Sequence, residues 1–542
     1  MGRGLNGSDT SAEAVRRRMR LLVLIGLVCA FQFYINLPVL DHDWVYFDDD
    51  INIVLNPHLT GTGDTFTWAW TDASYNRRYM PVGWVMFDGL FRLGGLNPVI
   101  YHAASWLLAA ANSVLLFLIA RRFISHRGFP TTHPTGWVDL SAALAVILLS
   151  AHPLRAETVA WASGLLYLGS TFLASLAVLA SFPLRPELAR TANEWLGRLL
   201  FLLSLLLYPV QVGLPLLLIL AAACAPSVRN WPDLLAALRL AVWRYASWLL
   251  LTLVVGGVNA LAATNSSTFS APGGIADYSF GSRLTHSAAL LGHYVVQCLW
   301  PAATSPFYGD LGALPVMQKF LLPLGTLGFC LVLIAWPRTR IAAALSLAVF
   351  LTAVLPFVGL LDKGQSANDR YTFLLLAAIT LALAGSLAKI PGPAGRVAAT
   401  ITLVAATALF LPAYRGALVV WGSTGSLQAR VDLVMAARPD VRLGFARPAM
   451  NDFMSGHYVA SQQRLRQGFA RFGAHPELLR AATFIEETRT SLTGGERDPS
   501  MPPYAFMHLD LAKKHRAAGY AYAAKVHADY ARRLMVVAVK GK

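Results

Sequence analysis

The sequence predicts an all-α polytopic membrane protein with about eleven transmembrane helices, a long first loop outside the cytoplasm and a small soluble helical domain at the C-terminus. Of its 542 residues, 56% are hydrophobic and only 14% are charged, whereas soluble domains carry about 25% charged residues. Apolar runs recur along most of the chain, and each is long enough to cross a hydrocarbon layer roughly 30 Å thick. Because lipid cannot satisfy exposed backbone groups, these runs are expected to form helices.

The net charge of +16 is explained by membrane topology rather than by nucleic-acid binding. The basic residues lie mainly in short loops between apolar runs, where the positive-inside rule places them. They do not gather in one patch. The four cysteines form neither a CxxC pair nor a cluster with histidine, so we predict no zinc site and no disulfide framework.

The basic residues also orient the predicted spans. Residues 1–20 are polar and basic, so we expect them in the cytoplasm, and the first apolar run lacks a clear cleavage site and is interpreted as an uncleaved span. The loop 41–97 then lies outside the cytoplasm. Within 21–415 the spans are expected at about 21–40, 98–119, 137–151, 160–182, two short spans within 197–226, 243–263, 319–336, 341–361, 371–388 and 397–415.

Two segments need a specific interpretation. The stretch 197–226 has basic loops on both sides, which requires an even number of crossings. Two prolines interrupt it, so we expect a tight hairpin that turns near 208–213. The segment 284–300 contains two histidines and a glutamine. If it crossed, the basic residues that follow would lie outside, so the positive-inside rule favours an interfacial or re-entrant segment.

Residues 416–542 are expected to form a small helical domain on the same side as the loop 41–97. The segments 430–437 and 458–472 show the periodicity of amphipathic helices. A loop rich in glycine and proline precedes a last helix expected at about 505–537. No repeat of 34 residues is evident, so at most a degenerate form of the TPR array is predicted.

The first candidate site is the acidic cluster after the first span. Asp48, Asp49 and Asp50 follow two further aspartates in the stretch 41–50. Close carboxylates raise one another's pKa, which favours a general base or a cation site. No dedicated metal ligands are indicated, but such a cluster is able to hold a hydrated Mg²⁺ or Mn²⁺. The alternative is a solvated loop whose carboxylates cap helices.

Two further loops on the same predicted side carry candidate residues. Arg77, Arg78 and Tyr79 stand among acidic and aromatic residues of the first loop, a mixture that suits a site for a sugar and an anion. His152 and Glu157 lie in the next loop outside the cytoplasm, where the alternative is that both cap adjacent helices.

A third group lies at the outer mouth of the span 371–388. The guanidinium of Arg370 has the planar shape that suits phosphate oxygens, and it is flanked by Asp369 and Tyr371. The alternative is an ion pair of Asp369 and Arg370 that reaches toward the membrane surface. The segment 300–308 is aromatic and is read from its residues alone as an interfacial belt.

An ordered set of motifs resembles the transmembrane-and-TPR-repeat O-mannosyltransferases and their bacterial relatives. The first loop and second span carry Phe47-Asp48-Asp49-Asp50, Asn56-Pro57, Tyr79-Met80-Pro81, Gly95-Leu96-Asn97-Pro98 and Tyr101-His102. The segment from His152 to Trp161 is similar to the family's His-Pro-x-x-x-Glu-Ser-Val-Ala-Trp. Later motifs match in order over about residues 40–425: Gly213-Leu214-Pro215, Leu299-Trp300-Pro301, Ser305-Pro306-Phe307-Tyr308 and Asp369-Arg370-Tyr371-Thr372.

The resemblance implies a GT-C glycosyltransferase that uses a polyprenyl-phosphate sugar, with mannose favoured, on the outer face of a plasma membrane. Residue usage rich in Ala, Leu and Arg suggests a bacterial inner membrane. One of Asp48, Asp49 and Asp50 would take the proton from the acceptor hydroxyl, and the acceptor is a protein, a glycan or a lipid. Arg370, followed by Arg77 and Arg78, would stabilise the leaving phosphate. Supporting substrate contacts would come from Tyr79, His152, Glu157, Asp369 and Tyr371.

The chain departs from the resemblance at two places besides its tail. Relatives carry a charged stretch where this chain has Gly164-Leu165-Leu166-Tyr167, and a lysine where it has Tyr208. The sugar and the acceptor therefore stay open. Two other functions are kept: a lipid or sugar transporter or flippase, which needs ionisable residues along a path through the spans, and a non-catalytic scaffold that presents its tail to a partner.

Overall fold

The computed structural model describes most of the chain, and helices dominate the described part, which contains no β-strand. The described residues are 7–126, 135–181, 191–223, 228, 230–264, 280–301, 304, 308, 321, 324–325, 328, 340–354, 367–437, 443–493 and 501–540. The predicted span 319–336 and the residues Ser305-Pro306-Phe307 therefore lie largely or wholly outside them.

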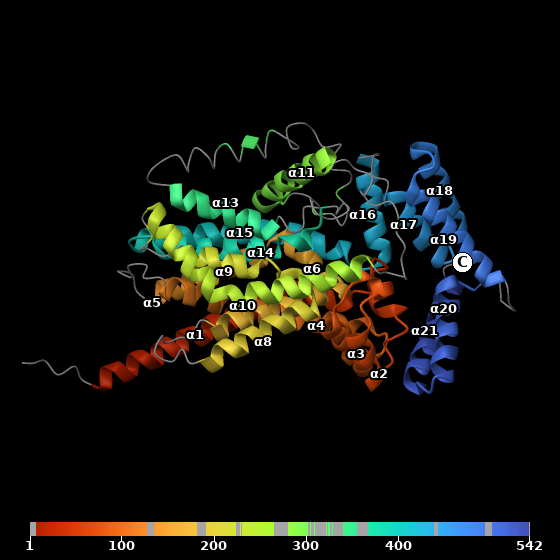
Figure 1. Cartoon of the computed structure of the whole chain (residues 1–542), viewed down its shortest axis with the longest axis horizontal. Coiled ribbons are helices and arrows are strands. Elements are labelled where there is room, and N and C mark those ends of the chain that lie inside the picture. The colour runs from red at the N-terminus through yellow and green to blue at the C-terminus, as the bar shows by residue number, and fades with distance from the viewer. Residues whose placement is uncertain are drawn as a thin grey trace, which may run out of the picture.

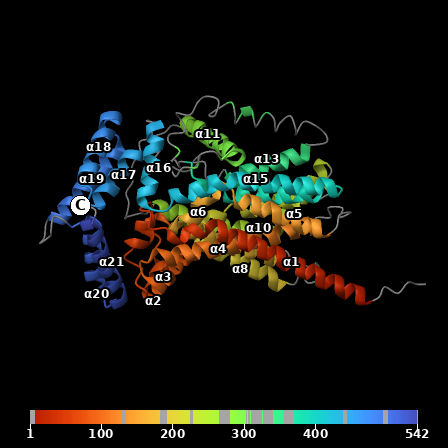
Figure 2. The same cartoon turned by 180° about the vertical axis from the view of Figure 1, so that it is seen from behind.

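Most of the helices form one elongated bundle (Figures 1 and 2). Its members are α1 Gly7–Asn36, α4 Pro98–His126, α5 Thr135–Ser150, α6 Ala156–Ala160, α7 Leu165–Ser181, α8 Thr191–Leu207, α9 Leu214–Ala223, α10 Trp231–Thr264, α11 Phe280–Leu299, α13 Arg340–Val354, α14 Phe373–Ala388 and α15 Pro393–Val420. The first loop, with α2 Gly63–Thr71 and α3 Pro81–Gly94, lies at the end of the bundle away from the start of α1.

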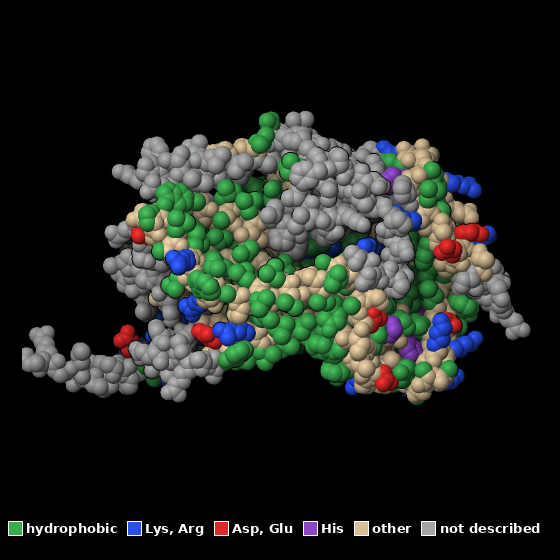
Figure 3. Space-filling view, viewed as in Figure 1, with side chains coloured by type: hydrophobic (Ala, Val, Ile, Leu, Met, Phe, Trp, Pro, Cys, Tyr) green, Lys and Arg blue, Asp and Glu red, His purple; other side chains and the backbone are tan. Residues whose placement is uncertain are grey.

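Six helices of the described chain are long and apolar enough to cross a membrane, or up to eight if each of two bent pairs is one span. The bent pairs are Gly136–Ser150 with Pro153–Ala160, at 72°, and Asn193–Leu207 with Pro209–Ala222, at 115°. Leu253 is 72% exposed and Leu409 78%, and the middle of the visible face is largely hydrophobic (Figure 3). Such surfaces suit lipid contact, which agrees with the predicted all-α membrane architecture.

The turn within 197–226 occurs where the sequence predicts it. α8 ends at Leu207, and the short 3-10 turn Pro209–Gln211 redirects the chain into α9. Proline favours this break because its ring prevents a normal helical hydrogen bond. Gly213 follows the turn, and a Cβ there would lie 2.9 Å from the carbonyl oxygen of Thr352. The close approach of α13 therefore requires glycine.

Charged side chains mark the end of the bundle at which α1 begins. Asp139 at the start of α5 accepts hydrogen bonds from Arg20 Nε at 3.1 Å and from Arg121 Nε at 2.5 Å. The Arg396 guanidinium lies 5.8 Å from the ring centre of Trp137, two residues before Asp139. This basic end is the one that the positive-inside rule assigns to the cytoplasm.

The segment 284–300 lies beside residues from the opposite end. Arg77 in the first loop donates hydrogen bonds to the carbonyl oxygen of Ala263 near the end of α10, at 3.1 and 2.9 Å. Tyr294 in α11 donates to the carbonyl oxygen of Asn368, just before α14, at 3.2 Å. The end of α10 and the α11 residue Tyr294 therefore both lie at the end of the bundle that carries the first loop. This arrangement favours the interpretation that 284–300 does not cross the membrane.

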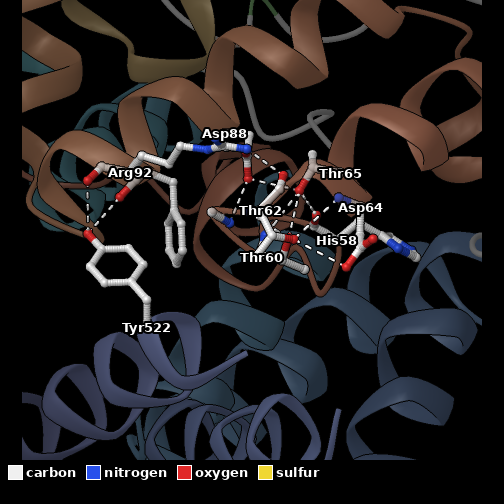
Figure 4. Close-up of polar contacts among 10 residues, drawn as sticks. His58, Thr60, Thr62, Asp64, Thr65, Asp88, Arg92 and Tyr522 are labelled. Carbon is white, nitrogen blue, oxygen red and sulfur yellow. Dashed lines mark hydrogen bonds and ion pairs between the residues drawn. The ribbon is translucent and has the colours of Figure 1, made fainter. Parts of the chain in front are cut away.

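The first loop is held by a polar network around Asp88 of α3 (Figure 4). This carboxylate accepts hydrogen bonds from Gly61 N at 2.8 Å, Thr65 Oγ1 at 2.8 Å and Arg92 Nε at 2.9 Å. Tyr522 from the C-terminal helices donates to the carbonyl oxygen of Phe91 at 2.9 Å. The loop and the tail therefore pack against each other at one end of the bundle.

The described part of the tail contains six helices: α16 Thr424–Ala437, α17 Leu443–Met454, α18 Tyr458–Phe472, α19 Pro476–Thr493, α20 Pro503–Ala517 and α21 Ala521–Lys540. The helix predicted at 458–472 is confirmed. The single last helix predicted at 505–537 is wrong, because α20 and α21 form a hairpin. Gly519 adopts φ +84°, and Tyr520 N donates to His515 O at 2.8 Å. Such a left-handed glycine ends helices.

Buried histidines link the two helices of this hairpin. His508 Nδ1 and His527 Nδ1 are 2.8 Å apart, and the rings of His527 and His515 stack with centres at 5.2 Å. Within the described chain, the Nε2 atoms of all three have no hydrogen-bond partner. Burial lowers the pKa of His508 to about 3 and keeps the pKa of His527 well below its usual value. Both imidazoles are therefore neutral in the folded state.

Acidification is expected to destabilise this hairpin selectively. The pKa of each histidine is lower in the folded than in the unfolded chain, so the unfolded chain binds more protons below pH 6.5 and the stability falls as the pH falls. Between about pH 6.5 and 5.5 the loss is roughly 1 kcal/mol for each of His508 and His527. Urea titration with a fluorescent probe on α21 measures it.

A matched pair of variants checks that prediction. Replacing His508 and His527 together by phenylalanine keeps two aromatic rings and removes their titration, so the pH dependence between 6.5 and 5.5 is expected to shrink by about 2 kcal/mol. The exposed His457 changed to phenylalanine serves as the control. Equal pH slopes in the double variant and the wild type would contradict the assignment.

Candidate functional site

The acidic trio Asp48, Asp49 and Asp50 lies in a tight turn of the first loop. Asp49 is fully buried, and its Oδ1 accepts hydrogen bonds from Ser163 N at 2.8 Å and Ser163 Oγ at 2.6 Å. Its Oδ2 accepts one from Val45 N at 3.0 Å. Burial raises the pKa of Asp49 to about 7, although these hydrogen bonds oppose the rise. Asp49 therefore braces the loop and presents no free oxygen to a substrate.

The other two carboxylates are more accessible. The side chains of Asp48 and Asp50 are 21% and 16% exposed, and both have one oxygen 3.8 Å from Nη2 of Arg447 in α17. Asp48 has φ +77°, a conformation that costs free energy for residues other than glycine and that clusters at functional sites. Burial raises the pKa of Asp50, and Arg447 counteracts this rise.

A buried ion pair lies next to the trio. Arg370 donates from a terminal guanidinium nitrogen to Glu157 Oε1, and its backbone N–H donates to Glu157 Oε2 at 2.9 Å. Its Nε donates to the hydroxyl of Tyr167 at 3.1 Å. The guanidinium also lies 5.2 Å from the ring centre of Trp161, two residues before the Ser163 that binds Asp49. The trio and Arg370 therefore share one region, but Arg370 is already committed to protein partners.

Arg78 is the cation best placed for an anionic substrate. Its guanidinium lies 5.6 Å from the ring centre of Tyr208, and Tyr208 and Asp48 are its main electrostatic neighbours. Among the residues that the structure describes, no hydrogen bond or ion pair holds this guanidinium. A partly buried arginine that faces a carboxylate and aromatic rings is prepared to bind phosphate oxygens.

The two departures from the family resemblance lie in direct contact. The Tyr167 hydroxyl donates to the Tyr208 hydroxyl at 3.3 Å, and the two ring centres are 4.7 Å apart. The tyrosine pair stands between Arg370, which it binds through Tyr167, and Arg78, which lies over Tyr208. The two positions at which the sequence departs from the resembled motifs thus form a neutral aromatic pair between two arginines.

Two of the predicted site residues serve the fold instead. Arg77 caps the end of α10 through its hydrogen bonds to Ala263. The backbone N–H of Tyr79 donates to Asn259 Oδ1 at 3.1 Å, and its hydroxyl donates to the carbonyl oxygen of Trp70 at 3.3 Å. These contacts fix the first loop onto α10. Neither side chain has a described contact with the trio.

His152 and Asp369 are also held by neighbours. His152 Nδ1 accepts a hydrogen bond from Leu154 N at 3.4 Å, and its Nε2 lies 3.2 Å from the carbonyl oxygen of Cys298. The imidazole therefore caps the turn Pro153–Arg155. The alternative that both His152 and Glu157 act as caps holds for His152 alone, because Glu157 pairs with Arg370. Asp369 accepts a hydrogen bond from the Tyr308 hydroxyl at 2.5 Å. The ring of Tyr371 lies 5.2 Å from the Arg370 guanidinium.

The carboxylates of the trio do not converge as metal ligands. Asp49 is buried and accepts three hydrogen bonds from Val45 and Ser163, and Asp48 and Asp50 face the guanidinium of Arg447. Across the described chain, no three His, Cys, Asp or Glu side chains are grouped as a metal site requires. The arrangement therefore does not fit the Mg²⁺ or Mn²⁺ that the acidic sequence suggested, and we derive no step through a metal ion.

A large apolar cavity of about 1110 Å³ lies between the bundle helices. Its lining includes Thr171, one helical turn after Tyr167 in α7, and Gln211, just after Tyr208. It extends between α4, α7, α9 and α14 to Lys389, at the basic end of the bundle. The cavity thus follows the long direction of the bundle, with the tyrosine pair near one of its ends.

No family model, curated protein or solved structure matches the chain. The site is therefore interpreted from its own residues.

Proposed function

We propose that this protein is a GT-C-type glycosyltransferase that moves a sugar from a polyprenyl-phosphate donor to an acceptor hydroxyl. The observation that carries the proposal is that Asp48, a partly exposed carboxylate, lies in the electrostatic surroundings of Arg78. Among the described residues, no hydrogen bond or ion pair holds the Arg78 guanidinium, which lies over the ring of Tyr208. A base on one side and a cation on the other are the two groups that such a transfer needs. The site lies at the end of the bundle opposite Arg20, Arg121 and Arg396, and the positive-inside rule then supports catalysis at the outer membrane surface.

The reaction follows from these two groups. The acceptor hydroxyl oxygen attacks the anomeric carbon of the sugar, and its proton passes to the carboxylate of Asp48. The bond from the anomeric carbon to the phosphate oxygen breaks, and polyprenyl phosphate leaves with the electron pair. Arg78 stabilises the charge that develops on the phosphate. A single displacement of this kind inverts the configuration at the anomeric carbon.

The apolar cavity supports a lipid-linked donor rather than a soluble nucleotide sugar. Its walls suit an isoprenoid chain, because burying each CH₂ group contributes about 0.8 kcal/mol. In this proposal the phosphate lies at the end of the cavity marked by Thr171 and Gln211, on the side of the tyrosine pair and Arg78. Mannose is the favoured sugar, on the resemblance alone.

Substituting Arg78 is expected to weaken use of the donor strongly. Arg78→Ala should lower kcat/KM for undecaprenyl-phosphate mannose by about 10²–10³-fold, because one positioned donor to a developing anion contributes roughly 3–4 kcal/mol. The measurement follows release of undecaprenyl phosphate by purified protein in nanodiscs, with serine and threonine peptides, oligosaccharides and lipid alcohols as acceptors.

Arg77→Ala is the matched control, since its side chain caps α10. It is expected to lower stability more than donor use, and equal losses of kcat/KM in both variants at equal stability would contradict the role of Arg78. Movement of the labelled lipid between the leaflets of vesicles without sugar transfer would favour a flippase. A stable protein that neither transfers nor moves the lipid would favour a scaffold.

A further inference from the structure

Arg447 from the C-terminal tail reaches the acidic trio of the first loop. Its Nη2 lies 3.8 Å from Oδ1 of Asp48 and 3.8 Å from Oδ1 of Asp50. The guanidinium also lies 5.0 Å from the ring centre of Phe47. The Arg447 side chain is only 30% exposed, so its charge acts on the two carboxylates with limited screening by water.

The helix that carries Arg447 is fixed to the backbone just before the trio. Asn451, one turn after Arg447 in α17, donates from Nδ2 to the carbonyl oxygen of Tyr46 at 3.3 Å. The N–H of Tyr46 donates to Thr424 Oγ1 at 3.0 Å. The ring of Tyr46 packs on Tyr504 from α20, with centres at 4.4 Å. Three tail helices, α16, α17 and α20, therefore contact Tyr46 of the first loop.

The electrostatic surroundings explain why a cation is needed there. Two neighbouring carboxylates that are partly buried disfavour each other's ionisation, and burial already raises the pKa of Asp50. Arg447 is the described cation that contacts both. The other charged or titratable groups that face the pair are Asp49, Tyr75, Arg78, Arg370 and Tyr504.

We infer that Arg447 is a positioning residue of the site, supplied by the tail, which holds Asp48 and Asp50 side by side as carboxylates. Its catalytic consequence rests on the proposed function, because Asp48 accepts a proton only if it has lost its own. The tail then completes the reaction centre and is more than a separate docking module.

The first test measures ionisation without requiring turnover. Arg447→Gln removes the charge and keeps a polar head group, while Arg447→Lys keeps the charge. Infrared difference spectra of the full-length protein in nanodiscs follow the band of protonated carboxyl groups against pH, and Asp48→Asn and Asp50→Asn identify their contributions. In Arg447→Gln the pKa of the pair is expected to rise by 1–2 units. In Arg447→Lys it should stay near the wild-type value.

The second test uses the pH profile of sugar transfer. In Arg447→Gln the acidic limb of the pH profile of kcat/KM should shift to higher pH by the same 1–2 pH units. In Arg447→Lys it should lie at the wild-type pH. A purely structural role would lower the rate equally at all pH values. The exposed Arg466 of α18, changed to glutamine, removes the same charge from the tail and should leave both profiles unchanged.

The outcomes separate the inference from the proposed function. Unchanged carboxyl titration in a folded Arg447→Gln protein would overturn the inference. A shifted titration in a protein whose wild type transfers no sugar would support the role of Arg447 and count against the transferase. If Arg447→Gln does not fold, Arg447→Met provides the neutral side chain, since it keeps the packing on Phe47.

Discussion

Asp48→Asn is expected to lower kcat for sugar transfer by about 10²–10⁴-fold, because the amide cannot take the proton of the acceptor hydroxyl. The substitution suits the backbone, since asparagine tolerates the left-handed conformation that Asp48 adopts at φ +77°. The folded protein should therefore persist. Transfer from undecaprenyl-phosphate mannose in nanodiscs measures the rate, and the thermal midpoint in detergent verifies folding.

Asp41→Asn provides the matched control for that experiment. Asp41 precedes the trio in the same acidic stretch and is exposed, so the variant loses the same charge without touching the site. We expect it to retain most of the activity. Full activity in Asp48→Asn together with complete loss in Asp50→Asn would transfer the role of the base to Asp50. Full activity in both would remove the basis of the transferase assignment.

Breaking the pair of Glu157 and Arg370 should have the largest effect on stability. In Glu157→Gln the Arg370 guanidinium stays buried without its counterion, and such a loss costs about 3–5 kcal/mol. Unfolding of the purified protein, followed by tryptophan fluorescence during heating, should show a clearly lower midpoint. Activity is expected to fall as well, because Arg370 also orders Tyr167 through their hydrogen bond.

A double variant separates the contribution of the Glu157–Arg370 ion pair to stability from the contributions of other contacts of these two side chains. Glu157→Gln combined with Arg370→Gln removes both charges, so its loss of stability should be smaller than the sum of the single losses. Glu194→Gln breaks an exposed pair with Arg198 at 3.2 Å and should cost less than about 1 kcal/mol. If Glu157→Gln and Glu194→Gln had equal midpoints, the buried pair would not have the importance that we assign to it.

Local and periodic features of the sequence predicted much of the fold. Basic loops on both sides of 197–226 and the prolines within it allowed the bend between α8 and α9 to be predicted. Both signals can be read within a short segment of the sequence. The last helix was predicted without its break, although Ala518-Gly519 is a recognisable ending for a helix. The eleven spans exceed the six to eight candidates of the described chain, and part of the difference lies in segments outside it.

The candidate site was predictable only in part. The acidic trio stood out by its composition, but its three carboxylates differ in role because Asp49 meets Ser163 whereas Asp48 and Asp50 face Arg447. Arg77 and Arg78 are adjacent and indistinguishable in the sequence. They diverge because Asn76 and Arg77 both have positive φ, which turns neighbouring side chains to different partners. The role of Arg447 could not be predicted from the sequence, because it depends on a contact between distant parts of the chain.

The contacts of Thr424, Asn451 and Tyr504 with Tyr46 have a consequence for biosynthesis. The ribosome synthesises the first loop long before α16, α17 and α20. During membrane insertion, the acidic turn of the nascent chain therefore lacks its contacts with the tail. The contacts of the tail with the first loop form only after the full-length polypeptide has been synthesised. A truncated product that lacks α16, α17 and α20 would therefore have no tail contacts on Tyr46 and no Arg447 beside Asp48 and Asp50.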